Sequence, residues 1–181
     1  MTGNRDKVVF VVHCVLNQTT RAQWGEGGAS REGGMVSEVV SLLMRQGIGA
    51  IQMECPEFSL YGNPRPPRSR EEYDTPEFKG KCREIAIQAC ERMEALMEGG
   101  GDPEIEVRAI LGFEGSPSCG VERTTRTING ERQRAPGRGH LIEALQRELR
   151  RRGMEIPFLG VSLRVEEGKE ALRRLEAIIE D

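Results

Sequence analysis

The sequence predicts an α/β fold, in which a mostly parallel sheet is flanked by helices in a Rossmann-like three-layer arrangement. Two observations predict it. Short runs rich in β-branched residues alternate along the chain with longer segments that carry apolar residues at helical spacing. The first run, KVVFVVHC at residues 7–14, is apolar without alternation, as in a strand buried on both faces of a parallel sheet. The 181 residues suit one domain spanning residues 1–181.

The first strand is followed by a polar, glycine-rich loop and then by a helix. The loop, residues 17–34, contains the lone Trp24, which suits either stacking on a base or anchoring the loop. A connection of this length is usually functional or disordered. Residues 35–46, MVSEVVSLLMRQ, have apolar positions at helical spacing, and Gly47 is a typical helix stop.

The middle of the chain predicts a second strand and a long helix. AIQMEC, residues 50–55, reads as a short strand. Residues 56–76 are proline-rich, and we expect them to be irregular. Residues 77–97 read as one helix, and the GGGDP sequence at 99–103 ends it.

The last part of the chain predicts two strands and two helices around a segment rich in Gly, Thr and Arg. Residues 106–112 form the third expected strand, and the segment 116–139 follows, with a hairpin at Asn129-Gly130. Residues 140–152 predict a helix, with basic residues in its last turn and a glycine directly after it. The remaining elements are a strand at 156–163 and a helix at 166–179.

Composition and charge argue against some classes of partner and location. The formal net charge is -3 and the pI is about 5.6, so the net charge gives no indication of RNA or DNA as a partner. The longest apolar stretch near the N-terminus is about half the length that a membrane span needs, and no cleavage site follows it. We therefore expect no membrane partner and a cytoplasmic location, where the odd count of five cysteines argues against a disulfide framework.

Three cysteines are expected at one edge of the predicted sheet. Cys14 closes the first strand, Cys55 closes the second, and Cys119 lies in the turn just beyond the third, within GSPSCG. Because parallel sheets bind ligands beyond the carboxyl ends of their strands, these three thiols should meet at a binding site. Cys82 and Cys90 share one predicted helix, and we expect them to be inert core residues.

Three thiolates at one site suit zinc or an iron–sulfur cluster. A [4Fe–4S] cluster usually takes four cysteines, so three leave one iron without a protein ligand and able to take a substrate sulfur atom. Three-thiolate zinc with water as its fourth ligand is the competing chemistry. A structural zinc site would more often show a C-x-x-C pair, which this sequence lacks.

The motifs VVHCVLN, MECPE and GSPSCG, in this order, resemble the small [4Fe–4S] desulfidases typified by thiouracil desulfidase. Residues 63–67, NPRPP, the Asn129-Gly130 pair and residues 137–145 also match that family, so the resemblance covers roughly residues 7–163. It implies that a three-cysteine [4Fe–4S] cluster removes sulfur from a thiolated nucleobase or nucleotide, by C–S bond hydrolysis without net redox change.

The resemblance also assigns residues. It implies that Cys14, Cys55 and Cys119 are the cluster ligands and that Glu57 and Ser116 are catalytic residues beside the open iron. Apart from the resemblance, Ser118, whose hydroxyl can orient a pyrimidine, and Asn17 and His13, which depart from the family's pattern, are expected to bind substrate. A carboxylate such as Glu57 can take the proton from a water that attacks the thiocarbonyl carbon.

Two other functions remain open at this point. One is a non-catalytic protein that carries iron–sulfur or sulfide, or senses oxygen. The other is a thiol hydrolase with Cys119 as nucleophile and His13 or His140 as base. The arginines at 123–138 suit a phosphate, as in a thiolated nucleotide or RNA, but they also suit a solvated basic loop.

Overall fold

The computed structural model describes residues 5–22, 33–99 and 103–180. Its central sheet has four parallel strands in the order β2-β1-β3-β6, which confirms the predicted parallel sheet. The strands are β1 (Arg5–Val11), β2 (Gly49–Gln52), β3 (Glu104–Phe113) and β6 (Phe158–Val161).

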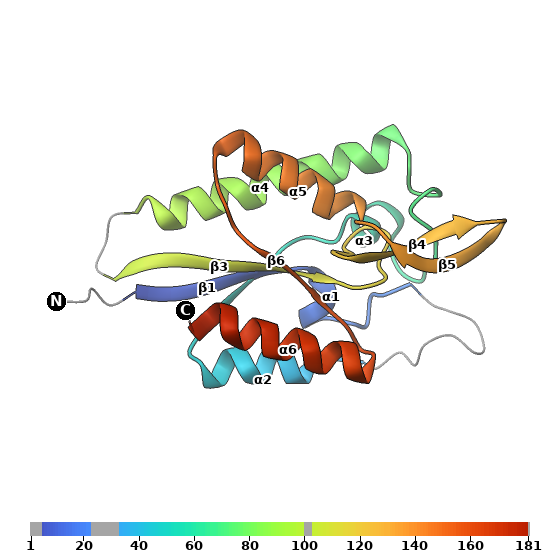
Figure 1. The fold of residues 1–181 in the computed structure, drawn as a ribbon. Coiled ribbons are helices and arrows are strands. Elements are labelled where there is room, and N and C mark those ends of the chain that lie inside the picture. Colours follow the sequence, from blue (N-terminus) through green and yellow to red (C-terminus); the bar gives the residue numbers. More distant parts are fainter. Residues whose placement is uncertain (1–4, 23–32, 100–102, 181) are drawn as a thin grey trace.

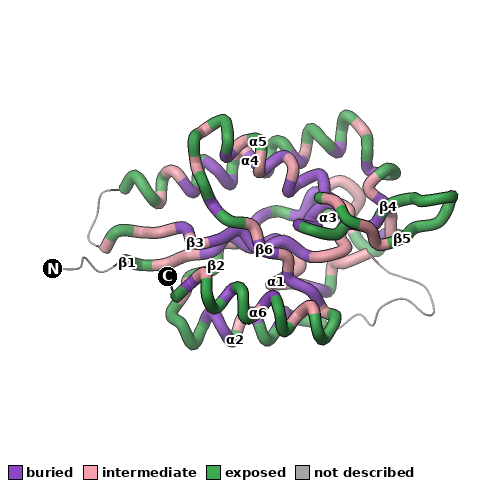
Figure 2. The backbone as a smooth tube through the Cα atoms, viewed as in Figure 1, coloured by how far each residue is buried: buried purple, intermediate pink, exposed green. Residues whose placement is uncertain are grey.

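Helices cover both faces of this sheet, so the fold has the three layers that the sequence predicts (Figure 1). The helices α4 and α5 lie on one face, and α2 and α6 lie on the other. Burial is deepest along the middle strands and the inner sides of the helices (Figure 2). The four helices are α2 (Ser37–Arg45), α4 (Pro76–Met97), α5 (His140–Arg152) and α6 (Val165–Glu180).

Local sequence explains where the long helices begin and end. The Thr75 side chain accepts a hydrogen bond from the backbone nitrogen of Phe78, which caps α4, and Pro76 occupies the first turn. Gly153 ends α5 in the left-handed conformation that glycine adopts most readily. None of the helices in the described ranges is both long and apolar enough to cross a membrane.

The first strand is shorter than predicted. It ends at Val11, and residues His13–Leu16 form a single helical turn, α1, so Cys14 lies on a helix and not at the end of a strand. The backbone nitrogen of Val12 still donates to the Leu111 carbonyl, and the chain then turns away from the sheet. The sequence does not mark this turn, because the apolar run continues from the strand through Val15 and Leu16 of the helix.

The proline-rich segment is not irregular throughout. Its first six residues form α3 (Pro56–Tyr61), directly after Cys55. Proline is well suited to the first position of a helix, since its missing N–H would have no helical partner there. The Cys55 Sγ accepts a hydrogen bond from the Phe58 nitrogen at 3.4 Å and caps this helix.

The predicted hairpin is present as β4 (Arg123–Ile128) and β5 (Glu131–Pro136), which pair antiparallel. Asn129 and Gly130 have φ values of 53° and 81°, as a tight hairpin turn requires. The hairpin projects beyond the carboxyl end of the sheet, at the same end as α1 and α3 (Figure 1).

Candidate functional site

A cavity of about 520 Å³ lies at the carboxyl end of the sheet, and all three predicted ligand cysteines line it. Cys14 comes from α1 after β1, Cys55 from the start of α3 after β2, and Cys119 from the turn after β3. The three segments belong to neighbouring strands of the sheet. The structure therefore brings together the thiols that the sequence placed at one edge.

The three thiols are free, and Cys55 and Cys119 are buried whereas Cys14 is half-buried. Burial, followed by the charge of Cys55, raises the pKa of Cys14 to about 12. Burial, followed by the charge of Glu57, raises the pKa of Cys55 to about 11. Burial, Cys55 and Cys14 raise the pKa of Cys119 well above its usual value. Without a cation these groups are protonated at neutral pH, and a positively charged metal group would favour their thiolate forms.

The turn that carries Cys119 is held from within and from α5. The Ser116 Oγ accepts hydrogen bonds from the backbone nitrogens of Cys119 at 3.0 Å and Ser118 at 3.3 Å. The backbone nitrogen of Leu141, at the start of α5, donates to the Ser118 carbonyl at 2.9 Å. Because its backbone groups are bonded on both sides, this turn presents Cys119 from a defined position.

Glu57 is a buried carboxylate on the wall of the cavity, with only 7% of its surface exposed. Its Oε1 accepts a hydrogen bond from the Ser118 hydroxyl at 2.6 Å. Its Oε2 accepts from the Tyr73 hydroxyl at 3.2 Å and from the Arg65 guanidinium at 3.3 Å. A buried charge persists only where it is paired and hydrogen-bonded, and Glu57 meets both conditions.

His13 lines the cavity with both ring nitrogens engaged. The amide nitrogen of Gln52 lies 2.6 Å from Nδ1, and an amide nitrogen can only donate, so Nε2 carries the hydrogen. Nε2 then donates to the Thr20 hydroxyl at 2.7 Å. Burial, followed by the charge of Arg65, lowers the pKa of His13, which keeps the ring neutral. His13 therefore has no nitrogen free to act as a base.

Arginine side chains line much of the remaining wall, and only Arg132 and Arg134 belong to the arginine-rich segment 123–138 that the sequence offered as a candidate phosphate site. Arg132 pairs with Glu72 and Arg134 pairs with Glu167. A further three have no ion-pair partner in the part of the chain that the structure describes. They are Arg21, whose guanidinium lies 4.4 Å from the centre of the Phe113 ring, Arg68, which lies 4.5 Å from the centre of the Tyr61 ring, and Arg164.

Most of the residues predicted for the site line this cavity. They are Cys14, Cys55, Cys119, Glu57, Ser116, Ser118 and His13. Asn17 does not line it; it ends α1, and its side-chain oxygen accepts a hydrogen bond from the Thr19 backbone. Trp24 lies outside the described residues. Sequence reasoning missed Tyr73, and it noted Arg65 only as part of the NPRPP segment.

Two further observations define the limits of the site. In residues 5–22, 33–99 and 103–180, no group of three or more His, Cys, Asp or Glu side chains is close enough together to hold a metal ion, and this includes the three cysteines that line the cavity. Cys82 and Cys90 are buried in α4, as predicted for core residues.

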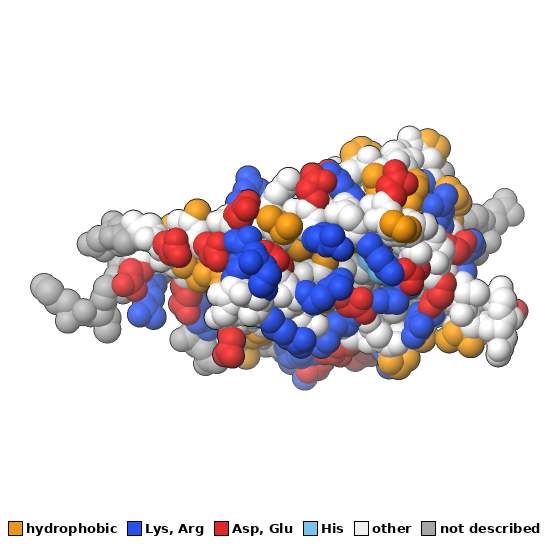
Figure 3. All heavy atoms as spheres, turned by 90° about the horizontal axis from the view of Figure 1, so that it is seen from above, with side chains coloured by type: hydrophobic (Ala, Val, Ile, Leu, Met, Phe, Trp, Pro, Cys, Tyr) orange, Lys and Arg blue, Asp and Glu red, His pale blue; other side chains and the backbone are white. Residues whose placement is uncertain are grey.

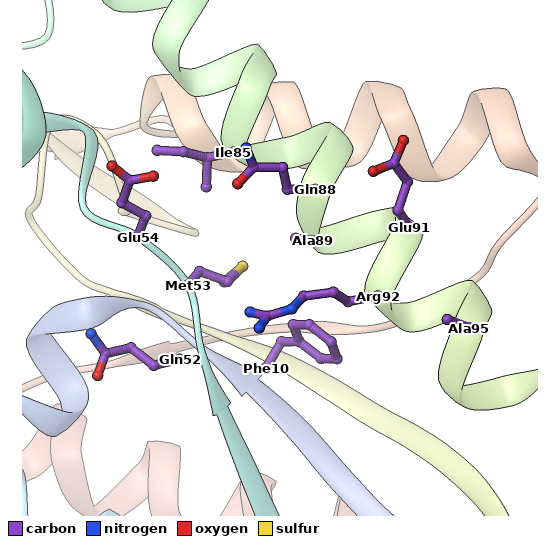
Figure 4. A pocket seen from close by; sticks show the side chains of 10 residues that line it. All are labelled: Phe10, Gln52, Met53, Glu54, Ile85, Gln88, Ala89, Glu91, Arg92 and Ala95. Atoms are coloured by element: carbon purple, nitrogen blue, oxygen red, sulfur yellow. The ribbon is translucent and has the colours of Figure 1, made fainter.

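A second cavity of about 650 Å³ lies between α4 and the segment around β2, and Figure 4 shows the side chains on its wall. Met53 points toward Ala89 and Arg92 there, whereas Gln52 points away from them, and no cysteine lines this cavity. The surface on the side of α4 and α5 carries Lys and Arg over its middle, interspersed with Asp and Glu (Figure 3). It is a mixed surface and not a uniformly basic one.

Comparisons with known proteins bear on the fold and on the family that the chain resembles. No protein-family model matches the chain. An uncharacterized protein of Methanocaldococcus jannaschii is 28% identical over 121 residues, which cover 67% of this chain and 70% of that protein. The solved structure of a [4Fe–4S]-dependent thiouracil desulfidase is similar with a TM-score of 0.53 and 26% identity, covering 95% of this chain and 99% of that one. This likeness confirms the resemblance and the α/β fold, and it supports a related iron–sulfur enzyme role at the level of the family.

Proposed function

We propose that this chain is a single-domain, [4Fe–4S]-dependent desulfidase. It removes sulfur from a thiolated nucleobase or nucleotide, or from a related thiocarbonyl compound. The observation that carries the proposal is one cavity whose wall holds three free cysteines and a buried carboxylate. In the reaction, water and the C=S group give a C=O group and hydrogen sulfide. The atoms balance without any oxidant or reductant.

The donor set fits the cluster. Thiolates are the usual ligands of [4Fe–4S] clusters, and Cys14, Cys55 and Cys119 would hold it. Their burial disfavours free thiolates, which suits residues whose charge is to be balanced by metal. When bound, the cluster supplies a soft Lewis acid, at an iron without a protein ligand, for the leaving sulfur. A reducing cytoplasm suits three free ligand cysteines.

The carboxylate would act on the water. The Nη2 of Arg65 lies 3.3 Å from the Oε2 of Glu57, so the charge of this buried carboxylate is paired. The Oε1 of Glu57 faces Ser118 and can receive the proton that the attacking water loses. Ser116 and Ser118 would orient the substrate ring with their hydroxyls. His13 would contact the substrate through its ring and hold the segment beside Cys14 through Thr20.

The unpaired arginines support a substrate that carries an anionic group. Arg21, Arg68 and Arg164 lie on the cavity wall without a carboxylate partner in the described part of the chain. Guanidinium groups bind phosphate oxygens through strong, charge-assisted hydrogen bonds. This arrangement favours a thiolated nucleotide over the bare base. The mixed surface of Figure 3 gives no comparable support to RNA.

The thiol hydrolase alternative is not favoured by the geometry. Cys119 has Ser118 as its neighbour and a raised pKa, so it lacks the activation that a nucleophilic cysteine needs. Both nitrogens of His13 are engaged, and His140 is buried with its Nε2 bonded to the Arg70 carbonyl. The non-catalytic carrier is the alternative that the experiment must separate.

The test measures iron, acid-labile sulfide and sulfide release. Protein reconstituted anaerobically should hold about four irons and four sulfides per chain and release sulfide from thiouracil or a thiolated nucleotide. Cys119→Ala should lose the cluster and the activity, whereas the matched core variant Cys90→Ala should keep both. A full cluster with no sulfide release from any thiocarbonyl compound would favour the carrier. Failure to bind iron would reject the cluster itself.

A further inference from the structure

We propose that Arg65 is a positioning residue for Glu57, in that its guanidinium fixes which carboxylate oxygen faces the reacting groups. The proposal rests on the desulfidase function proposed above, because it concerns the carboxylate that would receive the proton. Arg65 lies in the proline-rich segment, where sequence patterns gave it no role. It is 5% exposed, and its side chain lies on the wall of the cysteine-lined cavity.

The contacts of Arg65 are directional. Its Nε and Nη2 both donate to the Oε2 of Glu57, at 3.4 and 3.3 Å. Its Nη1 donates to two backbone carbonyls, Thr20 at 2.6 Å and Gly62 at 3.2 Å. The guanidinium is planar, so the carbonyls that hold one edge also fix the direction of the edge that faces Glu57. A point charge in the same place would not impose that direction.

The two oxygens of the Glu57 carboxylate therefore have different hydrogen-bond partners. The Oε2 receives Arg65 and the Tyr73 hydroxyl, whereas the Oε1 receives only the Ser118 hydroxyl among the described residues. Ser118 in turn lies 3.4 Å from the Sγ of Cys119. Arg65 and Tyr73 therefore engage Oε2, whereas Oε1 is bonded to the Ser118 hydroxyl, which neighbours the Cys119 thiol. We expect such an arrangement of a general base that takes a proton through only one of its two carboxylate oxygens.

Arg65 also joins two parts of the site. The Thr20 carbonyl that it binds belongs to the segment after α1, and the Thr20 hydroxyl bonds to His13, next to Cys14. Gly62 ends α3, the helix that carries Glu57. One side chain thus connects the Cys14 segment with the Cys55–Glu57 segment. A residue that only filled the core would not need polar contacts to three separate groups.

The experiment is a double-mutant cycle between Arg65→Ala and Glu57→Gln, followed by kcat, KM and iron content. If Arg65 acts through Glu57, each single variant should lower kcat by about 100-fold, and the double variant should fall no further than Glu57→Gln alone. KM and iron content should stay near the wild-type values. Guanidinium ion added to Arg65→Ala should restore kcat at least about tenfold, and it should restore nothing in Glu57→Gln. Arg173→Ala, an exposed arginine paired with Glu170, serves as the matched control and should match the wild type.

The possible outcomes separate the two proposals. A wild-type protein that binds iron but releases no sulfide rejects the proposed function. An active wild type with an equally active Arg65→Ala, or with losses in the two variants that multiply, overturns the positioning role and leaves the function standing. If Arg65→Ala does not fold, Arg65→Lys keeps the charge and loses the planar geometry. It should retain iron with kcat at least about tenfold lower, and full activity in Arg65→Lys would also overturn the proposal.

Discussion

A single added carbon at Gly139 should damage the site directly. This glycine immediately precedes α5 and packs against the turn that carries Cys119. A Cβ at Gly139 would lie 2.2 Å from the carbonyl carbon of Ser118 and 2.6 Å from the backbone nitrogen of Cys119. Its φ of -76° suits any residue, so the effect of Gly139→Ala is a steric one.

The magnitude follows from those distances. Ordinary contacts of a Cβ begin at 3.4 Å, so the Ser118–Cys119 backbone must move by about 1 Å. Overpacking of this kind costs about 1–3 kcal/mol, and disturbing the Leu141 to Ser118 hydrogen bond adds about 1 kcal/mol. We therefore expect a loss of about 2–4 kcal/mol in the free energy of unfolding, together with a displaced Cys119 thiol.

Urea unfolding and iron content measure the two consequences separately. Gly139→Ala should unfold at a lower urea concentration and bind less iron after reconstitution. Gly80→Ala is the matched control, because Gly80 lies inside α4 with nothing within 4 Å of an added Cβ. It should raise stability by about 0.5–1 kcal/mol and leave iron binding unchanged. If Gly139→Ala shows wild-type stability and a full iron content, the argument from close packing is wrong.

Two further predictions concern charges around the cavity. The hydrogen bond from Arg132 lowers the pKa of Glu72 to about 2, so this pair stabilises the fold above about pH 4.5 and loses its effect as the pH falls through 2. Because Glu72 is more than a third exposed, Glu72→Gln should lower the free energy of unfolding by less than about 1 kcal/mol at pH 7. In urea titrations at pH 2, the difference in stability between this variant and the wild type should be smaller. An equal difference at both pH values would contradict this prediction. Arg68→Ala should raise KM for a thiolated nucleoside monophosphate about tenfold or more and leave KM for thiouracil unchanged, and an equal effect on both substrates would remove the phosphate role.

The sequence was informative about the fold wherever a repeating pattern or a stop residue was present. The β-branched runs and the helical spacing indicated the alternating elements, and Gly153 and Asn129-Gly130 marked a helix end and a hairpin. Boundaries inside continuous apolar or proline-rich stretches were not predictable. The apolar run continues from β1 into α1, so the sequence does not show where the strand ends. Pro56 begins a proline-rich stretch, so the sequence does not show that α3 starts there.

Part of the candidate site was likewise predictable from the sequence, and part of it was not. The three cysteines could be placed together because parallel strands end at a common edge, which fixes their neighbours before any side chain is considered. Arg65 and Tyr73 reach Glu57 through the path of residues 62–75, which contain no regular helix or strand. No periodic pattern specifies that path. The direction of the Asn17 side chain was not predictable either, because it depends on the residue at which α1 ends.

The order of the strands also has a consequence for biosynthesis. During translation β1 can pair with β2 as soon as both have left the ribosome, which brings Cys14 and Cys55 near each other early. Cys119 follows only after α4 and β3 have been made, and its turn is supported by the start of α5. The three thiols can therefore converge only on a chain that is largely complete. Delivery of the proposed cluster would then be a late event in the life of each molecule, after β1, β2 and β3 have been made.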